Sequence, residues 1–153
     1  MRRNQLVLTT LSALLLYVAT PAQAQTATYF VATSGNDSNA GTQSAPWRTI
    51  GKAAKTAVAG STVNVRGGVY NERVTVSVSG SATAGYTTFQ SFPGETAIVD
   101  GTGLSVPSGD TGLFLIVNRS YLRLKGFEIR NFKTSTKDLV PVGINVRGSS
   151  HHI

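Results

Sequence analysis

The sequence repeats a short β-type run at intervals of 25, 26 and 30 residues: Val63-Asn64-Val65, Thr88-Phe89-Gln90, Phe114-Leu115-Ile116-Val117 and Ile144-Asn145-Val146. A second series is interleaved with the first: Val74-Thr75-Val76, Ile98-Val99-Asp100, Leu122-Arg123-Leu124 and His151-His152-Ile153. Repeats of this length, made of strands and turns, are typical of a solenoid in which each coil buries its inner face against its neighbours. The sequence therefore predicts an all-β solenoid over residues 61–153, with glycine-rich turns between the runs.

The first 24 residues read as a signal peptide. Arg2 and Arg3 form a positive n-region, residues 6–19 an apolar core, and Ala22-Gln23-Ala24 a small-x-small cleavage site. The apolar run is interrupted and shorter than the roughly 20 residues that a membrane span needs. We therefore predict export by the general secretory route and no membrane span after cleavage, with an uncleaved anchor or twin-arginine export as the alternatives.

The charge balance bears on the partners of the exported chain. Without Arg2 and Arg3, the net charge falls from +7 to about +5, which favours acidic polysaccharide, nucleic acid or an anionic surface as a partner. Export favours acidic polysaccharide over nucleic acid, although a modest positive excess also serves solubility alone. The chain has no cysteine, so packing and hydrogen-bond ladders must stabilise it without disulfides.

Residues 25–60 are predicted to form an N-terminal strand, a loop and a capping helix. The β-branched and aromatic run at 28–33 predicts the strand, and apolar residues at helical spacing predict a helix over 50–58. Thr49 is the expected N-cap and Gly60 the expected C′ glycine. Trp47 and the alanine-rich helix face would cover the open end of the first coil.

Residues 61–153 are predicted to be the first coils of a solenoid that is cut before its C-terminal cap, because the sequence ends inside a coil. The chain is expected to be the front part of a longer protein that is a monomer at full length.

Several segments together resemble one family: Tyr29-Phe30-Val31-Ala32-Thr33-Ser34-Gly35-Asn36-Asp37, Ala45-Pro46-Trp47-Arg48-Thr49-Ile50, Gly60-Ser61-Thr62-Val63-Asn64-Val65-Arg66-Gly67-Gly68, Leu122-Arg123-Leu124-Lys125-Gly126-Phe127 and Gly143-Ile144-Asn145-Val146. They are similar to the opening of secreted right-handed parallel β-helix proteins of the pectate-lyase-like superfamily, particularly polysaccharide lyase family nine and its uncharacterised relatives. The resemblance covers nearly all of residues 25–153. It is more specific for the fold than for the activity.

The resemblance implies Ca²⁺-assisted β-elimination on a uronic-acid polymer such as pectate, with a lysine base and an aspartate cluster for the metal. Residues after Asp100 contain no such cluster, since Asp110 and Asp138 stand alone. The catalytic residues therefore stay unassigned and no metal ligand is predicted. The catalytic centre is expected to lie beyond this sequence.

Arg123 and Lys125 are the candidate substrate-binding residues, because period two along a strand puts both on one face, where they could meet a uronate. A solvated outer face explains the same pattern equally simply. Two other motifs have a structural interpretation. The half calcium loop that begins at Asp37 is predicted to be an Asx-rich turn. His151 and His152, expected on opposite faces, read as turn residues and not as a metal site.

The predicted function is that of a secreted polysaccharide lyase-like protein acting on acidic polysaccharide. The first alternative is a non-catalytic β-helix that binds glycan at a surface. A hydrolase or epimerase on the same coil is the second alternative.

Overall fold

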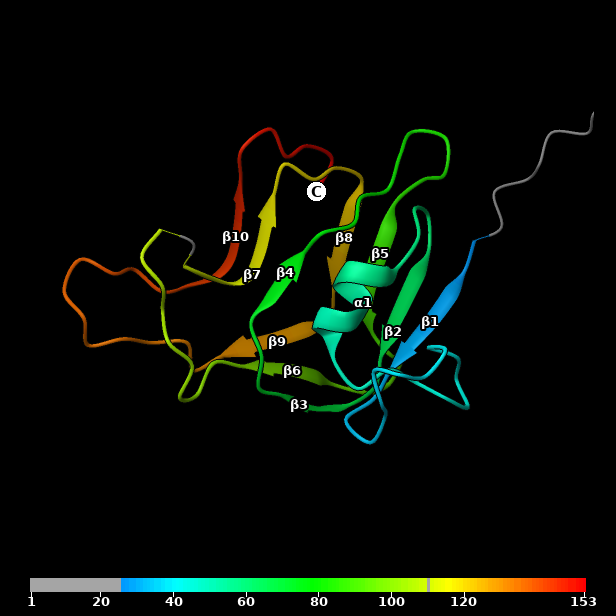
Figure 1. Cartoon of the computed structure of the whole chain (residues 1–153), viewed down its shortest axis with the longest axis horizontal. Coiled ribbons are helices and arrows are strands. Elements are labelled where there is room, and N and C mark those ends of the chain that lie inside the picture. The colour runs from blue at the N-terminus through cyan, green and yellow to red at the C-terminus, as the bar shows by residue number, and fades with distance from the viewer. Residues whose placement is uncertain (1–25, 110) are drawn as a thin grey trace, which may run out of the picture.

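The structure is a computed structural model that describes residues 26–109 and 111–153, so the predicted signal peptide lies outside the described residues. Its strands form three all-parallel sheets that wind around one axis (Figure 1). Sheet A contains β1 (Thr28–Val31), β2 (Thr62–Val65), β5 (Thr87–Ser91) and β8 (Leu122–Lys125). Sheet B contains β3 (Gly68–Tyr70), β6 (Ala97–Asp100) and β9 (Phe127–Arg130). Sheet C contains β4 (Val74–Val76), β7 (Gly112–Val117) and β10 (Val142–Arg147).

After β1 the chain visits sheets A, B and C in turn, so each coil adds one strand to every sheet. The predicted all-β solenoid is confirmed. The two series of runs do not correspond to single sheets: Val63 pairs with Phe89 in sheet A, but Phe114 pairs with Ile144 in sheet C, so the first series mixes two sheets. The reason is that the loops differ in length. Strands of sheet A begin at residues 62, 87 and 122, whereas those of sheet C begin at 74, 112 and 142.

The core is built of aligned side chains, one from each coil. In sheet C, Phe114 lies between Val74 and Ile144 in the register. Val74 and Phe114 are fully buried, whereas Ile144, on the last strand, is 44% exposed. Because parallel strands repeat at a fixed spacing, side chains at equivalent positions of successive coils stack along the axis and exclude water. Each fully buried side chain of this size contributes about 1.5–3 kcal/mol.

The N-terminal helix α1 (Ile50–Thr56) begins where the sequence predicts. The Thr49 side chain accepts a hydrogen bond from the Lys52 backbone N–H, which is the expected N-cap contact. Glu72, from the loop after β3, adds a second cap: its two carboxylate oxygens accept the Ile50 and Gly51 backbone N–H groups at 2.8 and 2.9 Å. This cap joins the helix to the first coil.

The predicted ends of two elements are wrong. The helix stops at Thr56 because Ala57 turns extended, with ψ 138°, and Gly60 supplies its positive φ of 79° to the following turn and not to a C′ position. The first strand ends at Val31, two residues earlier than predicted, where the chain turns toward Gly35. No helix within the described residues is long and apolar enough to cross a membrane.

The predicted lid over the first coil is confirmed. Trp47 is 3% exposed, and Ile50, Ala53 and Ala54 on the helix are fully buried in the same apolar cluster as the coils. The Trp47 ring stacks on Tyr29 with centroids 4.7 Å apart. Figure 1 shows α1 lying across the end of the solenoid between sheets A and C. The cap therefore covers what would otherwise be an open apolar end.

Candidate functional site

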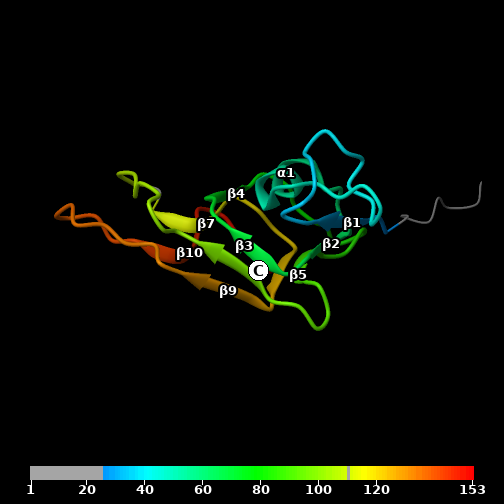
Figure 2. The same cartoon turned by 90° about the horizontal axis from the view of Figure 1, so that it is seen from below.

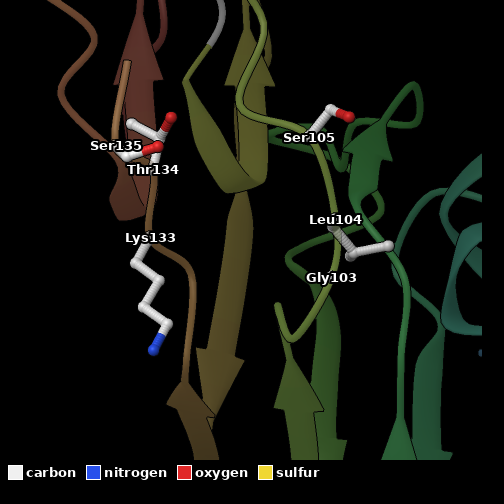
Figure 3. Close-up of a pocket in the computed structure, with 6 residues that line it drawn as sticks. All are labelled: Gly103, Leu104, Ser105, Lys133, Thr134 and Ser135. Atoms are coloured by element: carbon white, nitrogen blue, oxygen red, sulfur yellow. The ribbon is translucent and has the colours of Figure 1, made fainter. Parts of the chain in front are cut away.

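An open cleft lies between the two long loops that connect sheet B to sheet C. One loop follows β6 (101–111) and the other follows β9 (131–141), and they extend side by side from the same end of the molecule (Figures 1 and 2). The cleft has a volume of about 520 Å³. Its lining residues are Gly103, Leu104, Ser105, Lys133, Thr134 and Ser135 (Figure 3).

The lining of this cleft combines polar and apolar groups. One wall contains Ser105, and the other contains Lys133, Thr134 and Ser135. Figure 3 shows the Lys133 side chain extending away from the hydroxyls of its neighbours, which separates the positive charge from the neutral hydrogen-bonding groups. Such a set can hold a ligand that carries hydroxyl groups and one negative charge.

The sequence signalled these loops only as polar excursions from the coil, of the kind that forms binding surfaces. It did not predict the cleft residues. The cleft exists because β6 and β9 pair in register, Ala97 with Phe127 and Asp100 with Arg130, and so place the loops next to each other. The two walls are about 30 residues apart in the sequence, so no local sequence pattern predicts that they lie next to each other.

Asp100 holds the roots of both loops together at the end of β6. It is 5% exposed. One carboxylate oxygen accepts the Thr102 backbone N–H at 2.8 Å, and the other accepts from Arg130 Nε at 2.8 Å and Asn131 Nδ2 at 3.0 Å. Hydrogen bonds from Thr102, then those from Arg130 and Asn131, hold the pKa of Asp100 well below its usual value. The carboxylate is therefore charged at neutral pH, and it ties one loop to the other.

Replacing Asp100 by asparagine is expected to lower the stability at pH 7, because an amide group cannot satisfy the arginine as a carboxylate does. The folded-state pKa is depressed, so this stabilisation is present above the ordinary value of 3.8 and is lost as the pH falls below it. We would measure the urea midpoints of the wild type and of Asp100→Asn from pH 7 to about pH 2.5. The difference between the two midpoints should become smaller as the pH falls. Asp138→Asn, at an exposed position in the second loop, is the control and should leave the urea midpoint at pH 7 unchanged. A difference in midpoint between the wild type and Asp100→Asn that stays the same at every pH would contradict the expectation.

Arg123 and Lys125, the candidates from the sequence, lie on β8 in sheet A and are both exposed. Leu122, with its side chain on the opposite face, is fully buried, so both basic side chains point outward from the solenoid. Lys125 is in register with Gln90, whose side-chain amide donates to Asn64 at 2.9 Å. The outer face of sheet A therefore carries a row of amide groups that ends in a lysine.

The structure does not bring these two basic residues to the loop cleft. They lie on sheet A, whereas the cleft lies between loops that connect sheets B and C. The basic pair on sheet A and the loop cleft are thus separate surfaces.

The half calcium loop at Asp37 has a structural role. Asp37 accepts hydrogen bonds from the backbone N–H groups of Arg48 and Thr49, both at 2.9 Å, and from the Thr49 hydroxyl at 2.7 Å. These contacts tie the loop to the residues just before α1, and the Asx turn of the loop is made by Asn36, whose Oδ1 accepts the Ser38 backbone N–H at 2.9 Å. Within 26–109 and 111–153, no group of three or more Asp, Glu or His side chains is placed to hold a metal ion. The described residues therefore do not fit the Ca²⁺ that the resemblance implies.

Comparison with known protein families shows the family to which the chain belongs. The family described as "Pel9A-like, right handed beta helix region" matches residues 29–153. The chain belongs to the Pel9A-like right-handed β-helix family. The match includes all of the strands after Thr28 and gives the solenoid its hand.

Two curated proteins are similar to this Pel9A-like chain. The uncharacterised protein YwoF of Bacillus subtilis is 34% identical over 125 residues, which are 81% of this chain and 26% of YwoF. Pectate lyase PEL9 of Emericella nidulans is 31% identical over 134 residues, which are 80% of this chain and 30% of that enzyme. The chain thus spans less than a third of the length of either relative.

Among solved structures, a rhamnogalacturonan lyase superposes with a TM-score of 0.55 at 22% identity, covering 71% of this Pel9A-like chain and 30% of that protein. At this identity the similarity concerns the fold alone. These comparisons support membership in a polysaccharide lyase-like family.

Proposed function

We propose that the protein acts outside the cytoplasm on an acidic polysaccharide of the pectate type, which it cleaves by β-elimination. The loop cleft carries this proposal, because its lining includes one lysine, which can pair with a carboxylate, and three residues with hydroxyl groups, which can bind sugar hydroxyls. Membership in the Pel9A-like family supports the same substrate class. Export rests on the predicted signal peptide at residues 1–24.

The cleft offers a complementary contact for each part of a uronate. The ammonium group of Lys133 can pair with the carboxylate, and the hydroxyl groups of Ser105, Thr134 and Ser135 can exchange hydrogen bonds with the sugar hydroxyls. The volume of about 520 Å³ lies in the range of small-molecule sites. Arg123 and Lys125 on sheet A would hold a different part of the same polymer.

The proposed reaction removes the proton from the carbon next to the carboxylate, forms a carbon–carbon double bond and expels the glycosidic oxygen of the neighbouring sugar. A cation at the carboxylate acidifies that proton. The residues that the structure describes supply Lys133 for binding, and the base is unassigned.

The test is an assay of the full-length protein on polygalacturonate and on alginate, with and without Ca²⁺, followed by the absorbance of the unsaturated uronate. Lys133→Ala is expected to raise KM about fivefold, since an exposed ion pair is worth about 0.2–1 kcal/mol. Lys137→Ala is the matched control: the same loop carries Lys137, but it does not line the cleft. No absorbance change on any uronate polymer would overturn the β-elimination, and an equal effect of both variants would overturn the role of the cleft.

The alternative function is a non-catalytic β-helix that binds acidic glycan. The exposed pair Arg123 and Lys125, far from the loop cleft, favours it, because a polymer can be held there without any cleavage. Polygalacturonate binding without unsaturated product would identify this function.

A further inference from the structure

Besides the loop cleft, the molecule has a distinctive corner where the chain passes from sheet C to sheet A. We call this the C–A corner; it consists of residues 77–86, 118–121 and 148–153, the segments that connect or follow the strands of sheet C. In Figure 1 it lies along the upper edge, whereas the cleft loops extend at the left, and the C-terminus ends at this corner. Four aromatic rings meet at this corner: Tyr86, Tyr121, His151 and His152.

The rings form a continuous row along the solenoid axis. Tyr86 meets Tyr121 edge to face with centroids 5.6 Å apart. Tyr121 stacks on His152 at 4.5 Å with an interplanar angle of 7°. Contrary to the expectation from the sequence, His151 and His152 do not diverge: their rings are 5.1 Å apart. The positive φ of 54° at His152 turns the chain and brings both rings onto Tyr121.

The guanidinium group of Arg123 lies over the free end of this row. Its carbon is 3.9 Å from the centroid of the Tyr86 ring, a close cation–π contact. Arg123 is exposed, and no carboxylate among the described residues forms an ion pair with it. A stacked guanidinium offers its N–H edge outward, in the planar fork that binds a carboxylate through two hydrogen bonds.

The charges of the solenoid are segregated around its axis. The described acidic residues of the coils lie on sheet B or in the loops that flank it: Glu72, Glu95, Asp100, Glu128 and Asp138. All three ion pairs of the described residues lie there too. By contrast, the segments of sheets A and C and of the C–A corner contain no Asp or Glu. Arg123 therefore has no internal competitor for a carboxylate ligand at this corner.

The loop that carries Tyr86 is held rigidly. Ser81 and Gly85 exchange two backbone hydrogen bonds, of 3.0 and 2.8 Å, and close a small turn. Gly80 lets this turn approach the neighbouring coil: a Cβ at Gly80 would lie 2.4 Å from the Tyr121 carbonyl oxygen. These contacts hold the backbone next to Tyr86, and its ring packs on Tyr121, so Arg123 stacks on a surface that is present without a ligand.

We propose that Arg123, stacked on Tyr86, is a preorganised receptor for the carboxylate of one sugar unit of an acidic polysaccharide, at a site separate from the loop cleft. Tyr86 is a positioning residue that acts through Arg123. The inference rests on the proposed function for its ligand class. Nucleic acid fits less well, because Arg123 covers one face of Tyr86 and His152 covers Tyr121, so these ring faces are not open for bases to stack.

The experiment measures the Kd of the full-length protein for polygalacturonate, alginate and fully methyl-esterified polygalacturonate, by calorimetry at low and high salt. Arg123→Ala is expected to weaken binding of the two acidic polymers about tenfold. Arg123→Lys, which keeps the charge but loses the planar fork, should weaken it about threefold. Tyr86→Leu should also cost about threefold, whereas Tyr86→Phe, which keeps the ring, should bind as the wild type does.

Lys55→Ala removes an exposed positive charge from α1, a residue that is not part of the ring row, and should change nothing. None of the variants should alter binding of the esterified polymer, which has no carboxylates. Wild-type affinity of Arg123→Ala or Tyr86→Leu for polygalacturonate would overturn the proposal. So would equal losses on the esterified polymer, or tighter, Arg123-dependent binding of single-stranded DNA. This binding assay needs no turnover. Its result therefore tests the role of Arg123 even if the protein does not cleave the polymer.

Discussion

Replacing Trp47 by alanine is expected to lower the free energy of unfolding by about 3–5 kcal/mol, the usual cost of removing a fully buried large aromatic side chain. Trp47 is the centre of the lid on the first coil. It is 3% exposed, stacks on Tyr29, and donates from Nε1 to the Asn39 carbonyl oxygen at 2.8 Å. The Gly41 backbone lies directly against its ring, so that a Cβ at Gly41 would be 2.6 Å from the indole. No neighbouring group can move in to fill the space.

The measurement is urea unfolding followed by circular dichroism, because Trp47 is the only tryptophan of the chain. Trp47→Phe is the matched control: it keeps an aromatic ring but loses the hydrogen bond, and it should cost about 1 kcal/mol plus the loss from its smaller ring. A Trp47→Ala protein within 1 kcal/mol of the wild type would mean that the cap does not seal the first coil.

Phe114→Ala is expected to cost a similar amount, about 3–5 kcal/mol, for a different reason. Phe114 lies in the middle of the stack in sheet C, fully buried between Val74 and Ile144, and its ring contacts Phe127 with centroids 5.4 Å apart. Removing the ring leaves a cavity between coils, and the hydrogen-bonded ladders on both sides keep the coils from closing it.

Ile144→Ala is the matched comparison in the same stack. Ile144 occupies the next position along the axis but is 44% exposed in this chain, so its truncation should cost about 1 kcal/mol. Both variants are measured in the 153-residue chain by urea unfolding. A loss for Ile144→Ala that equals the loss for Phe114→Ala would contradict the order of burial along the solenoid.

Much of the fold could be predicted from local patterns. The period of the apolar runs predicted a solenoid, and Thr49 followed by apolar residues at helical spacing predicted the start of α1. These signals are local, since a strand needs only its own alternation and a helix only its own cap. What the patterns could not provide was the pairing: Phe89 pairs with Leu124 and not with Phe114, because a longer loop shifts the next strand by several residues.

The candidate site was predictable only in part. Arg123 and Lys125 could be placed on one exposed face from period two alone. The partner of Arg123 could not be predicted, since Tyr86 lies 37 positions earlier and reaches it only through the pairing of β5 with β8. In the same way Lys133 and Ser105 line one cleft only because β6 pairs with β9.

By itself, the sequence predicted an all-β solenoid with an N-terminal helical cap and a basic outer strand, and its resemblance to a family implied that the coils are parallel and right-handed. The solenoid follows from the repeat of short runs along the chain, and the cap and the outer strand follow from the spacing of residues within one segment. The tertiary structure alone decided which coils meet, and therefore where the loop cleft, the Asp100 anchor and the C–A corner lie. The physical reason is that these sites are assembled from successive coils, and the register of parallel strands, together with the length of each loop, sets which side chains become neighbours across the axis.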